Sequence, residues 1–301
     1  MSQQKAYIYA GLAIFFWSTV ATVFKIALQY LDPLNLVMYA SFTSFVALFI
    51  IVLVKGKLKE IRTFTRGDIG NSMILGFLNP FLYYIILFKA YSLLPAQVAQ
   101  PLNMVWPIVL VFLSIPFLKQ KIGVSSFIAL FISFTGVLLI SSQGDVVHFG
   151  KSNPVGVLLA LGSSLIWSFF FIFNLRDKRD EELKLLLNFF FSTILIVLLN
   201  LILGNFSVPV FKGLAAAAYI GLFEMGITFL FWLKALSLSK STDRISNYVY
   251  LAPFVSLIFI HYFLGEKIYG TTILGLLLIV SGIIYQKVRS NRKSPTHKLS
   301  D

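Results

Sequence analysis

Apolar stretches of about twenty residues follow one another along almost the whole of this chain of 301 residues. A helical stretch of this length is long enough to cross the hydrocarbon core of a bilayer. Together the stretches leave only short loops, with no room for a water-soluble domain. The sequence therefore predicts an all-α membrane protein with ten transmembrane helices. The predicted spans cover residues 7–28, 34–54, 69–91, 97–118, 123–141, 154–174, 184–203, 213–236, 244–263 and 269–288.

The composition agrees with a chain that lies inside a bilayer. Hydrophobic residues make up 58% of it and charged residues only 12%, whereas soluble domains carry about 25% charged residues. There is no cysteine, so disulfides, thiolate catalysis and cysteine-based metal sites are excluded. The sequence contains no phosphate-binding glycine loop, nucleophile elbow or metal-ligand spacing. We therefore expect no enzyme activity, no metal site and no cofactor, with an intramembrane enzyme or a scaffold as the alternative class.

Positive charge is distributed unevenly between the predicted loops. The formal net charge is +13, yet the loops on the side opposite the N-terminus hold only Lys151, Lys212 and Lys267. An excess of Lys and Arg in the loops of one side is typical of the cytoplasmic side. We therefore predict a multi-pass protein of the cell (inner) membrane, with both termini cytoplasmic and a cytoplasmic basic tail at 289–301. The charge then records topology, and no nucleic-acid partner is expected.

The chain repeats itself with a long and nearly constant period. Gly76 and the segment 89–93 recur as Gly221 and the segment 234–238, which lie 145 positions later. A fixed period indicates a duplicated structural unit. Each unit holds five predicted spans, an odd number, so the second unit begins on the opposite side of the membrane. The fold is therefore predicted to consist of two inverted five-helix repeats. Their predicted limits are 1–144 and 145–288.

Inverted repeats place a binding site at the repeat interface near the membrane midplane. Of twelve acidic residues, Glu224 alone lies at the centre of a predicted span. Intramembrane carboxylates are functional candidates by default, so Glu224 is interpreted as a proton-titrating group or as the counter-ion of a substrate ammonium. A protonated packing residue is the alternative. The repeat register places Asn79 opposite Glu224 and Tyr83 opposite Thr228, and all four are candidate site residues.

The fourth and ninth predicted spans carry polar residues beside a proline. Gln100 and Asn103 share one helical face with Pro107, and Tyr250 stands in the same relation to Pro253. A proline within a span frees a backbone carbonyl, which neighbouring side chains or cavity water must satisfy. This pattern favours a cavity lining, with ordinary hydrogen bonding between helices as the alternative.

Several aromatic residues share a predicted face with polar residues or a proline. These pocket candidates are Trp17, Tyr83, Trp106, Trp167 and Tyr250. The tryptophans lie too far from the span ends for an easy interfacial role, and core packing is the alternative. Lys25 follows Trp17 on one stripe of the first span. It is predicted either to contact a substrate carboxylate or to reach the membrane interface with its long side chain.

Both halves end with the same sequence pattern. A span with a proline is followed by a loop with a basic residue and by a final span with a glycine. These residues are Pro107, Lys121 and Gly136 in the first half, and Pro253, Lys267 and Gly282 in the second. Glu266 precedes Lys267, whereas the matching position holds Gln120. Over residues 7–288 the pattern resembles the ten-helix EamA-type branch of the drug/metabolite transporter superfamily. Within it, the segments 16–19, 103–107 and 166–167 are most similar to the bacterial aromatic amino acid exporters.

This resemblance implies a secondary transporter that exports a small organic solute by alternating access. An amino acid is the leading substrate class, with aromatic ones favoured. A carrier of nucleotide sugars, or of another metabolite or drug, is the alternative within the superfamily. The implied partners are a small-molecule substrate and the lipid bilayer, and the sequence does not distinguish a monomer from a homodimer.

Overall fold

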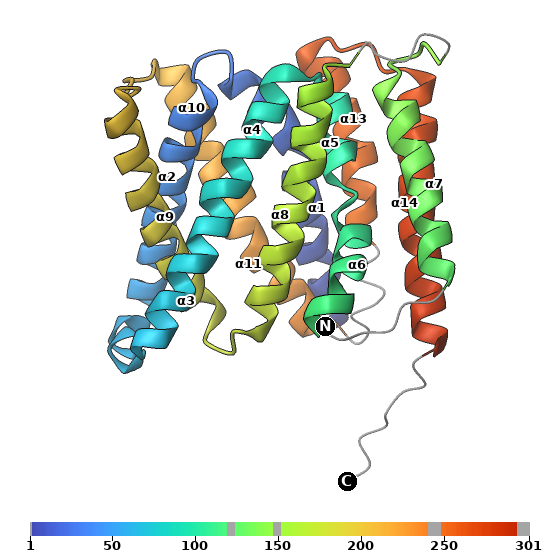
Figure 1. Ribbon diagram of the computed structural model, residues 1–301. Helices are drawn as coiled ribbons and strands as arrows, with labels where there is room; N and C mark the ends of the chain where they lie inside the picture. Colours follow the sequence, from blue (N-terminus) through green and yellow to red (C-terminus); the bar gives the residue numbers. More distant parts are fainter. Residues whose placement is uncertain (1, 119–123, 147–151, 240–247, 294–301) are drawn as a thin grey trace.

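The computed structural model describes residues 2–118, 124–146, 152–239 and 248–293. Within these ranges every regular element is a helix, and the helices stand side by side in one bundle (Figure 1). Nine helical stretches of the described chain are long and apolar enough to cross a membrane, and the apolar stretch Val249–Leu264 is shorter. The predicted all-α membrane fold is confirmed. The first four residues of the predicted ninth span lie in the undescribed range 240–247.

The first half of the chain contains nine of the described helical elements. They are α1 (Ser2–Ala27), α2 (Pro33–Val54), η1 (Lys57–Thr63), α3 (Arg66–Gly76), η2 (Phe77–Leu82), α4 (Tyr83–Leu93), α5 (Ala96–Asn103), α6 (Trp106–Leu118) and α7 (Val124–Ser141), followed in the second half by α8 (Pro154–Arg176). The remaining elements are α9 (Glu181–Leu203), α10 (Phe211–Ile220), η3 (Gly221–Gly226), α11 (Ile227–Leu238), η4 (Val249–Leu251), α13 (Ala252–Leu264) and α14 (Gly270–Lys293).

Three of the predicted spans are interrupted helices. The span 69–91 is divided by the π-helical turn η2, and the span 213–236 by the π-helical turn η3. The span 97–118 is divided between α5 and α6, next to Pro107. Proline lacks the N–H that would continue the helical hydrogen bonds, which accounts for the breaks at Pro80 and Pro107. The sequence pattern identified these spans but not their interruptions.

The two repeats use glycine in the same way where two helices meet. A Cβ atom on Gly76 would lie closer than 3.0 Å to the backbone oxygen of Asn188, and one on Gly221 equally close to that of Ala40. Gly76 and Gly221 are the repeat-related pair recognised in the sequence. The structure therefore packs α3 on α9 and the start of η3 on α2 through matching backbone contacts, as an inverted duplication requires.

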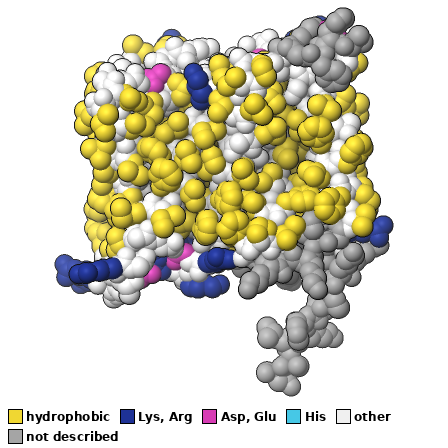
Figure 2. All heavy atoms as spheres, viewed as in Figure 1, with side chains coloured by type: hydrophobic (Ala, Val, Ile, Leu, Met, Phe, Trp, Pro, Cys, Tyr) yellow, Lys and Arg dark blue, Asp and Glu magenta, His cyan; other side chains and the backbone are white. Residues whose placement is uncertain are grey.

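The surface of the bundle is apolar around its middle. Figure 2 shows hydrophobic side chains over most of the visible face, with Lys and Arg concentrated at the end of the bundle where the N-terminus lies. Large exposed residues such as Phe131, Leu158 and Ile202 belong to this surface. An exposed apolar belt of this kind suits contact with lipid chains. The chain is a multi-pass membrane protein, and we call the end of the bundle that carries the N-terminus its N-terminal face.

Candidate functional site

Two broken helices meet in the interior of the bundle. At Asn79 the backbone leaves the helical region, with φ −149° and ψ 121°, directly before Pro80. The matching turn η3 carries Glu224. Irregular backbone at membrane depth is tolerated where it is buried in protein or lines a cavity, and π-helical turns often occur at functional sites. The sequence-predicted pair Asn79 and Glu224 therefore lies on two such turns.

Glu224 is joined to the opposite repeat through a residue that sequence analysis did not single out. The hydroxyl of Tyr84 donates a hydrogen bond of 3.2 Å to Glu224 Oε1. Tyr84 is 3% exposed and is the second residue of α4, which follows the break at η2. The repeat register predicts Asn79 opposite Glu224. The residue that contacts Glu224 is instead Tyr84, which lies about one turn after Asn79. Its position five residues after Asn79 could have indicated it, but two adjacent tyrosines gave no preference for Tyr84 over Tyr83.

A chain of polar contacts continues from this pair into the sixth predicted span. The rings of Tyr83 and Tyr84 lie 4.7 Å apart. Tyr83 donates a hydrogen bond of 3.2 Å to Asn103 Oδ1, and Asn103 Nδ2 donates one of 2.8 Å to Ser163 Oγ. Thus side chains from α4, α5 and α8 form one polar group in the interior. We call Glu224, Tyr84, Tyr83, Asn103 and Ser163 the midplane cluster.

Aromatic rings cover the midplane cluster on one side. The ring of Trp167 lies 5.0 Å from that of Tyr83 and 6.4 Å from that of Trp106. Ser168 holds this wall in place, since its hydroxyl donates a hydrogen bond of 3.0 Å to the backbone oxygen of Trp106. The structure therefore brings together the predicted residues Tyr83, Asn103, Trp106, Trp167 and Glu224.

Three further predicted residues carry buried oxygens without a hydrogen-bond partner among the described residues. They are Asn79 Oδ1, Gln100 Oε1 and Thr228 Oγ1. Buried polar groups in native proteins nearly always have a partner, and leaving one unpaired in an apolar interior is costly. These oxygens are therefore free to accept hydrogen bonds from a bound solute or from water.

The remaining predicted residues lie apart from this cluster. Trp17 packs on α1 against Trp232 of α11, with ring centroids 5.5 Å apart. Tyr250 lies in η4, partly buried against the hydrophobic core. Lys25 donates hydrogen bonds of 2.8 and 3.0 Å to the backbone oxygens of Tyr91 and Leu94, at the end of α4. Cations suit the carbonyls of a helix C-terminus, and neither sequence-based interpretation of Lys25 anticipated this contact.

The face of the bundle opposite the N-terminal face is tied together across the two repeats. Glu266 accepts hydrogen bonds from the backbone N–H groups of Ala96, at 2.8 Å, and Gln97, at 3.1 Å. Gln97 in turn donates 2.7 Å to the backbone oxygen of Lys267 and accepts 3.1 Å from Thr272 Oγ1. A carboxylate suits the N-terminus of α5. We call these contacts the Glu266 latch.

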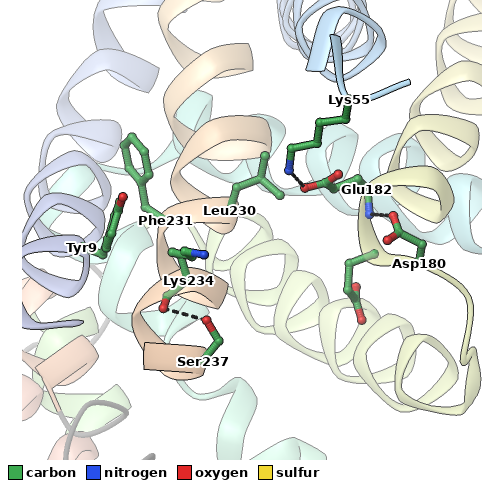
Figure 3. Close-up of a pocket in the computed structure, with 9 residues that line it drawn as sticks. Tyr9, Lys55, Asp180, Glu182, Leu230, Phe231, Lys234 and Ser237 are labelled. Atoms are coloured by element: carbon green, nitrogen blue, oxygen red, sulfur yellow. Dashed lines mark hydrogen bonds and ion pairs between the residues drawn. The ribbon is translucent and has the colours of Figure 1, made fainter. Parts of the chain in front are cut away.

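The N-terminal face is hollowed instead. A cavity of about 490 Å³ lies between α1, α11 and the facing ends of α2 and α9 (Figure 3). Its walls include Tyr9, Lys55, the segment 180–182, Phe231 and Lys234. We call it the vestibule. Among the described residues, Glu266 ties the two repeats together on one face, and the vestibule hollows the other.

Comparison with known proteins gives a consistent family assignment. The sequence profile of the EamA-like transporter family matches residues 4–142 and again residues 154–285. An uncharacterized transporter of Clostridium kluyveri is 24% identical, covering 97% of this chain and 95% of its own length. One from Archaeoglobus fulgidus is 25% identical, over 93% and 96% respectively. The uncharacterized transporter YvbV of Bacillus subtilis is 22% identical, over 92% and 90%.

The fold also resembles that of a protein of known crystal structure. The similarity has a TM-score of 0.67 at 19% sequence identity and covers 97% of this chain and 99% of the other. At this identity the likeness concerns the fold alone.

Proposed function

The chain belongs to the EamA-like transporter family, and on that premise we propose that it is a secondary transporter that exports a small organic solute by alternating access. Inverted repeats offer two related packings, one open to each side of the membrane. The Glu266 latch on one face and the vestibule on the other support an arrangement open to the N-terminal face.

The observation that carries this proposal is the contact of Tyr84 with Glu224. It joins a carboxyl of one repeat to a hydroxyl of the other, beside the two broken helices. A group at this position can change partners when the repeats rearrange. Intramembrane carboxylates mark substrate or proton pathways, so Glu224 is proposed to bind a substrate ammonium or to carry a proton.

An amino acid, and an aromatic one in particular, is the proposed substrate. Glu224 supplies a counter-charge for an ammonium, and Asn103 and Gln100 supply amide groups for a carboxylate. The rings of Tyr83, Trp106 and Trp167 supply an aromatic wall, and such faces attract both apolar groups and cations. A nucleotide sugar, another metabolite or a drug is the alternative within the same superfamily.

In the proposed topology the chain spans the cell (inner) membrane, and its N-terminal face lies on the cytoplasmic side. The concentration of Lys and Arg at that face supports it (Figure 2). Both termini are then cytoplasmic, with repeats at 1–144 and 145–288 and a basic tail at 289–301. Export would begin from the vestibule.

The test is transport by the purified chain in proteoliposomes. A panel of labelled amino acids and other metabolites is offered with and without a pH gradient, and counterflow is measured. A carrier exchanges labelled substrate across the bilayer, whereas an intramembrane enzyme converts it chemically. Exchange of an aromatic amino acid supports the whole proposal, exchange of another solute supports only the carrier, and conversion without exchange contradicts it.

A further inference from the structure

The vestibule contains charged groups that the proposed chemistry at Glu224 does not use. Its volume of about 490 Å³ lies in the range of about 300–1,000 Å³ that is typical of small-molecule sites. It is bounded by α1 and α11 on one side and by the ends of α2 and α9 on the other (Figure 3). A charged group that forms no ion pair or hydrogen bond within the protein is available to a bound solute.

Most of these charges pair with one another. Lys55 bonds to Glu182, and Lys57 donates hydrogen bonds of 2.6 Å to Asp180 and 3.1 Å to Glu182. Lys234, in contrast, makes no hydrogen bond or ion pair through its ammonium with any part of the chain that the structure describes. Figure 3 shows its side chain directed from α11 towards the wall that carries Glu182. Lys234 is therefore the one ammonium of the vestibule wall without a partner among the described residues.

The opposite wall has one free acceptor. Glu181 forms an ion pair with Lys184 through Oε1, at 2.7 Å. Its second oxygen, Oε2, is buried and has no hydrogen-bond partner among the described residues. Tyr9 and Phe231 add aromatic surface on the side of Lys234 that faces away from Glu182 (Figure 3). The vestibule thus combines a free donor, a free acceptor and an aromatic surface.

We propose that the vestibule is a capture site for a zwitterionic solute with an apolar side chain. The ammonium of Lys234 binds the carboxylate of the solute, Glu181 accepts hydrogen bonds from its ammonium, and Tyr9 and Phe231 contact the apolar group. Phe231 lies on α11, the helix that begins directly after the turn η3 with Glu224. Binding of a solute in the vestibule does not require that the chain transports it. The role of this site as the start of an export route rests on the proposed function.

The absence of native cysteine allows a direct test in the full-length chain. In Ser237→Cys the thiol lies in the vestibule, and its rate of labelling by a maleimide is measured with increasing L-phenylalanine. The control is Ser92→Cys, the repeat-related position on the opposite face, whose side chain is also exposed. We expect L-phenylalanine to slow labelling in Ser237→Cys and to leave it unchanged in Ser92→Cys.

Charge variants then separate binding in the vestibule from a conformational effect. Lys234→Gln is expected to raise the half-protecting concentration of L-phenylalanine about tenfold, which corresponds to about 1.4 kcal/mol. Lys89→Gln, at the repeat-related position on the opposite face, is expected to leave it unchanged. Phenylacetate, which lacks the ammonium, and phenethylamine, which lacks the carboxylate, are each expected to protect more weakly than L-phenylalanine.

Two results overturn the capture site: absence of protection in Ser237→Cys, or a protection curve that is the same with and without Lys234→Gln. Equal protection by phenylacetate and L-phenylalanine overturns the role of Glu181. Failure of the proposed function gives a different result, because protection would persist while wild-type proteoliposomes exchanged no solute. Transport without protection contradicts the capture site alone.

Discussion

Tyr84 and Glu224 stand 140 positions apart in the sequence, yet the hydroxyl of Tyr84 donates a hydrogen bond of 3.2 Å to Glu224 Oε1. The two residues belong to different repeats: Glu224 lies in the π-helical turn η3, and Tyr84 follows the π-helical turn η2. This contact connects the midplane cluster to the second repeat, so its removal tests whether the cluster acts as one unit.

Replacing Tyr84 by Phe removes the donor and keeps the ring. Hydrogen bonds to charged groups contribute about 1.5–3 kcal/mol, so we expect the initial rate of counterflow to fall about tenfold or more. In a Glu224→Gln background the same change is expected to add little, because coupled residues are not additive. Tyr91→Phe is the control, since this buried tyrosine also lies on α4 and packs against Phe24 of α1. Equal effects of Tyr84→Phe in both backgrounds would show that the two residues act independently.

The glycine contacts between the repeats predict specific losses of stability. Gly76→Ala and Gly221→Ala each place a methyl group against a backbone oxygen of a neighbouring helix. Overpacking of this kind costs about 1–3 kcal/mol, so both variants should lose their folded form at lower temperature in detergent. Gly11→Ala is the control, because nothing lies within 4 Å of its added Cβ. Thermal stability followed by size-exclusion chromatography gives the comparison, and unchanged stability in both variants would exclude the tight packing described.

The Glu266 latch predicts which face opens when it is weakened. Glu266→Gln removes the charge that suits the N-terminus of α5, so that end of the bundle should open more often. In a Val98→Cys background, where residue 98 is fully buried, Glu266→Gln is expected to speed labelling by a membrane-impermeant maleimide several-fold. Lys267→Gln serves as the control, because Lys267 enters the latch only through its backbone oxygen. Identical labelling rates in the Glu266→Gln variant and its parent would remove the latch from the account.

The ion pairs on the N-terminal face predict a pH dependence of stability. Burial alone would raise the pKa of Asp180, but the hydrogen bond from Lys57, with backbone N–H donors, outweighs it and lowers that pKa. Stability from a lowered carboxyl pKa is present above the unfolded pKa, near pH 4, and is lost as the pH falls through the folded value. Lys57→Gln should therefore be less stable than wild type at pH 7, and the difference should disappear towards pH 3. Lys59→Gln should match wild type at both pH values, and a difference for Lys57→Gln that persists at pH 3 would contradict this assignment.

Sequence periodicity was sufficient for the fold because the membrane imposes a simple rule. Each crossing needs about twenty apolar residues in a helix, and an odd number of helices per repeat implies inversion. The breaks at Asn79 and Glu224 were not predicted, since apolar character continues through both turns and only Pro80 indicates the first.

The sequence predicted only part of the candidate site. Glu224 and Asn103 were recognisable because polar residues inside a span are costly. Tyr84 was not, because an aromatic residue in an apolar span has the same pattern whether it packs or binds. Lys25 was identified as unusual, but its partners are backbone carbonyls of another helix, and sequence spacing cannot place those.

Counterflow by the Glu224→Gln variant tests the central claim most directly. The labelled solute is the member of the panel that wild-type proteoliposomes exchange fastest, measured across a range of pH. We expect Glu224→Gln to lose most of this exchange or its pH dependence. Glu60→Gln, which changes an exposed residue of η1, is expected to behave like wild type. Wild-type rates and an unchanged pH profile in Glu224→Gln would contradict a role for the midplane carboxyl in transport.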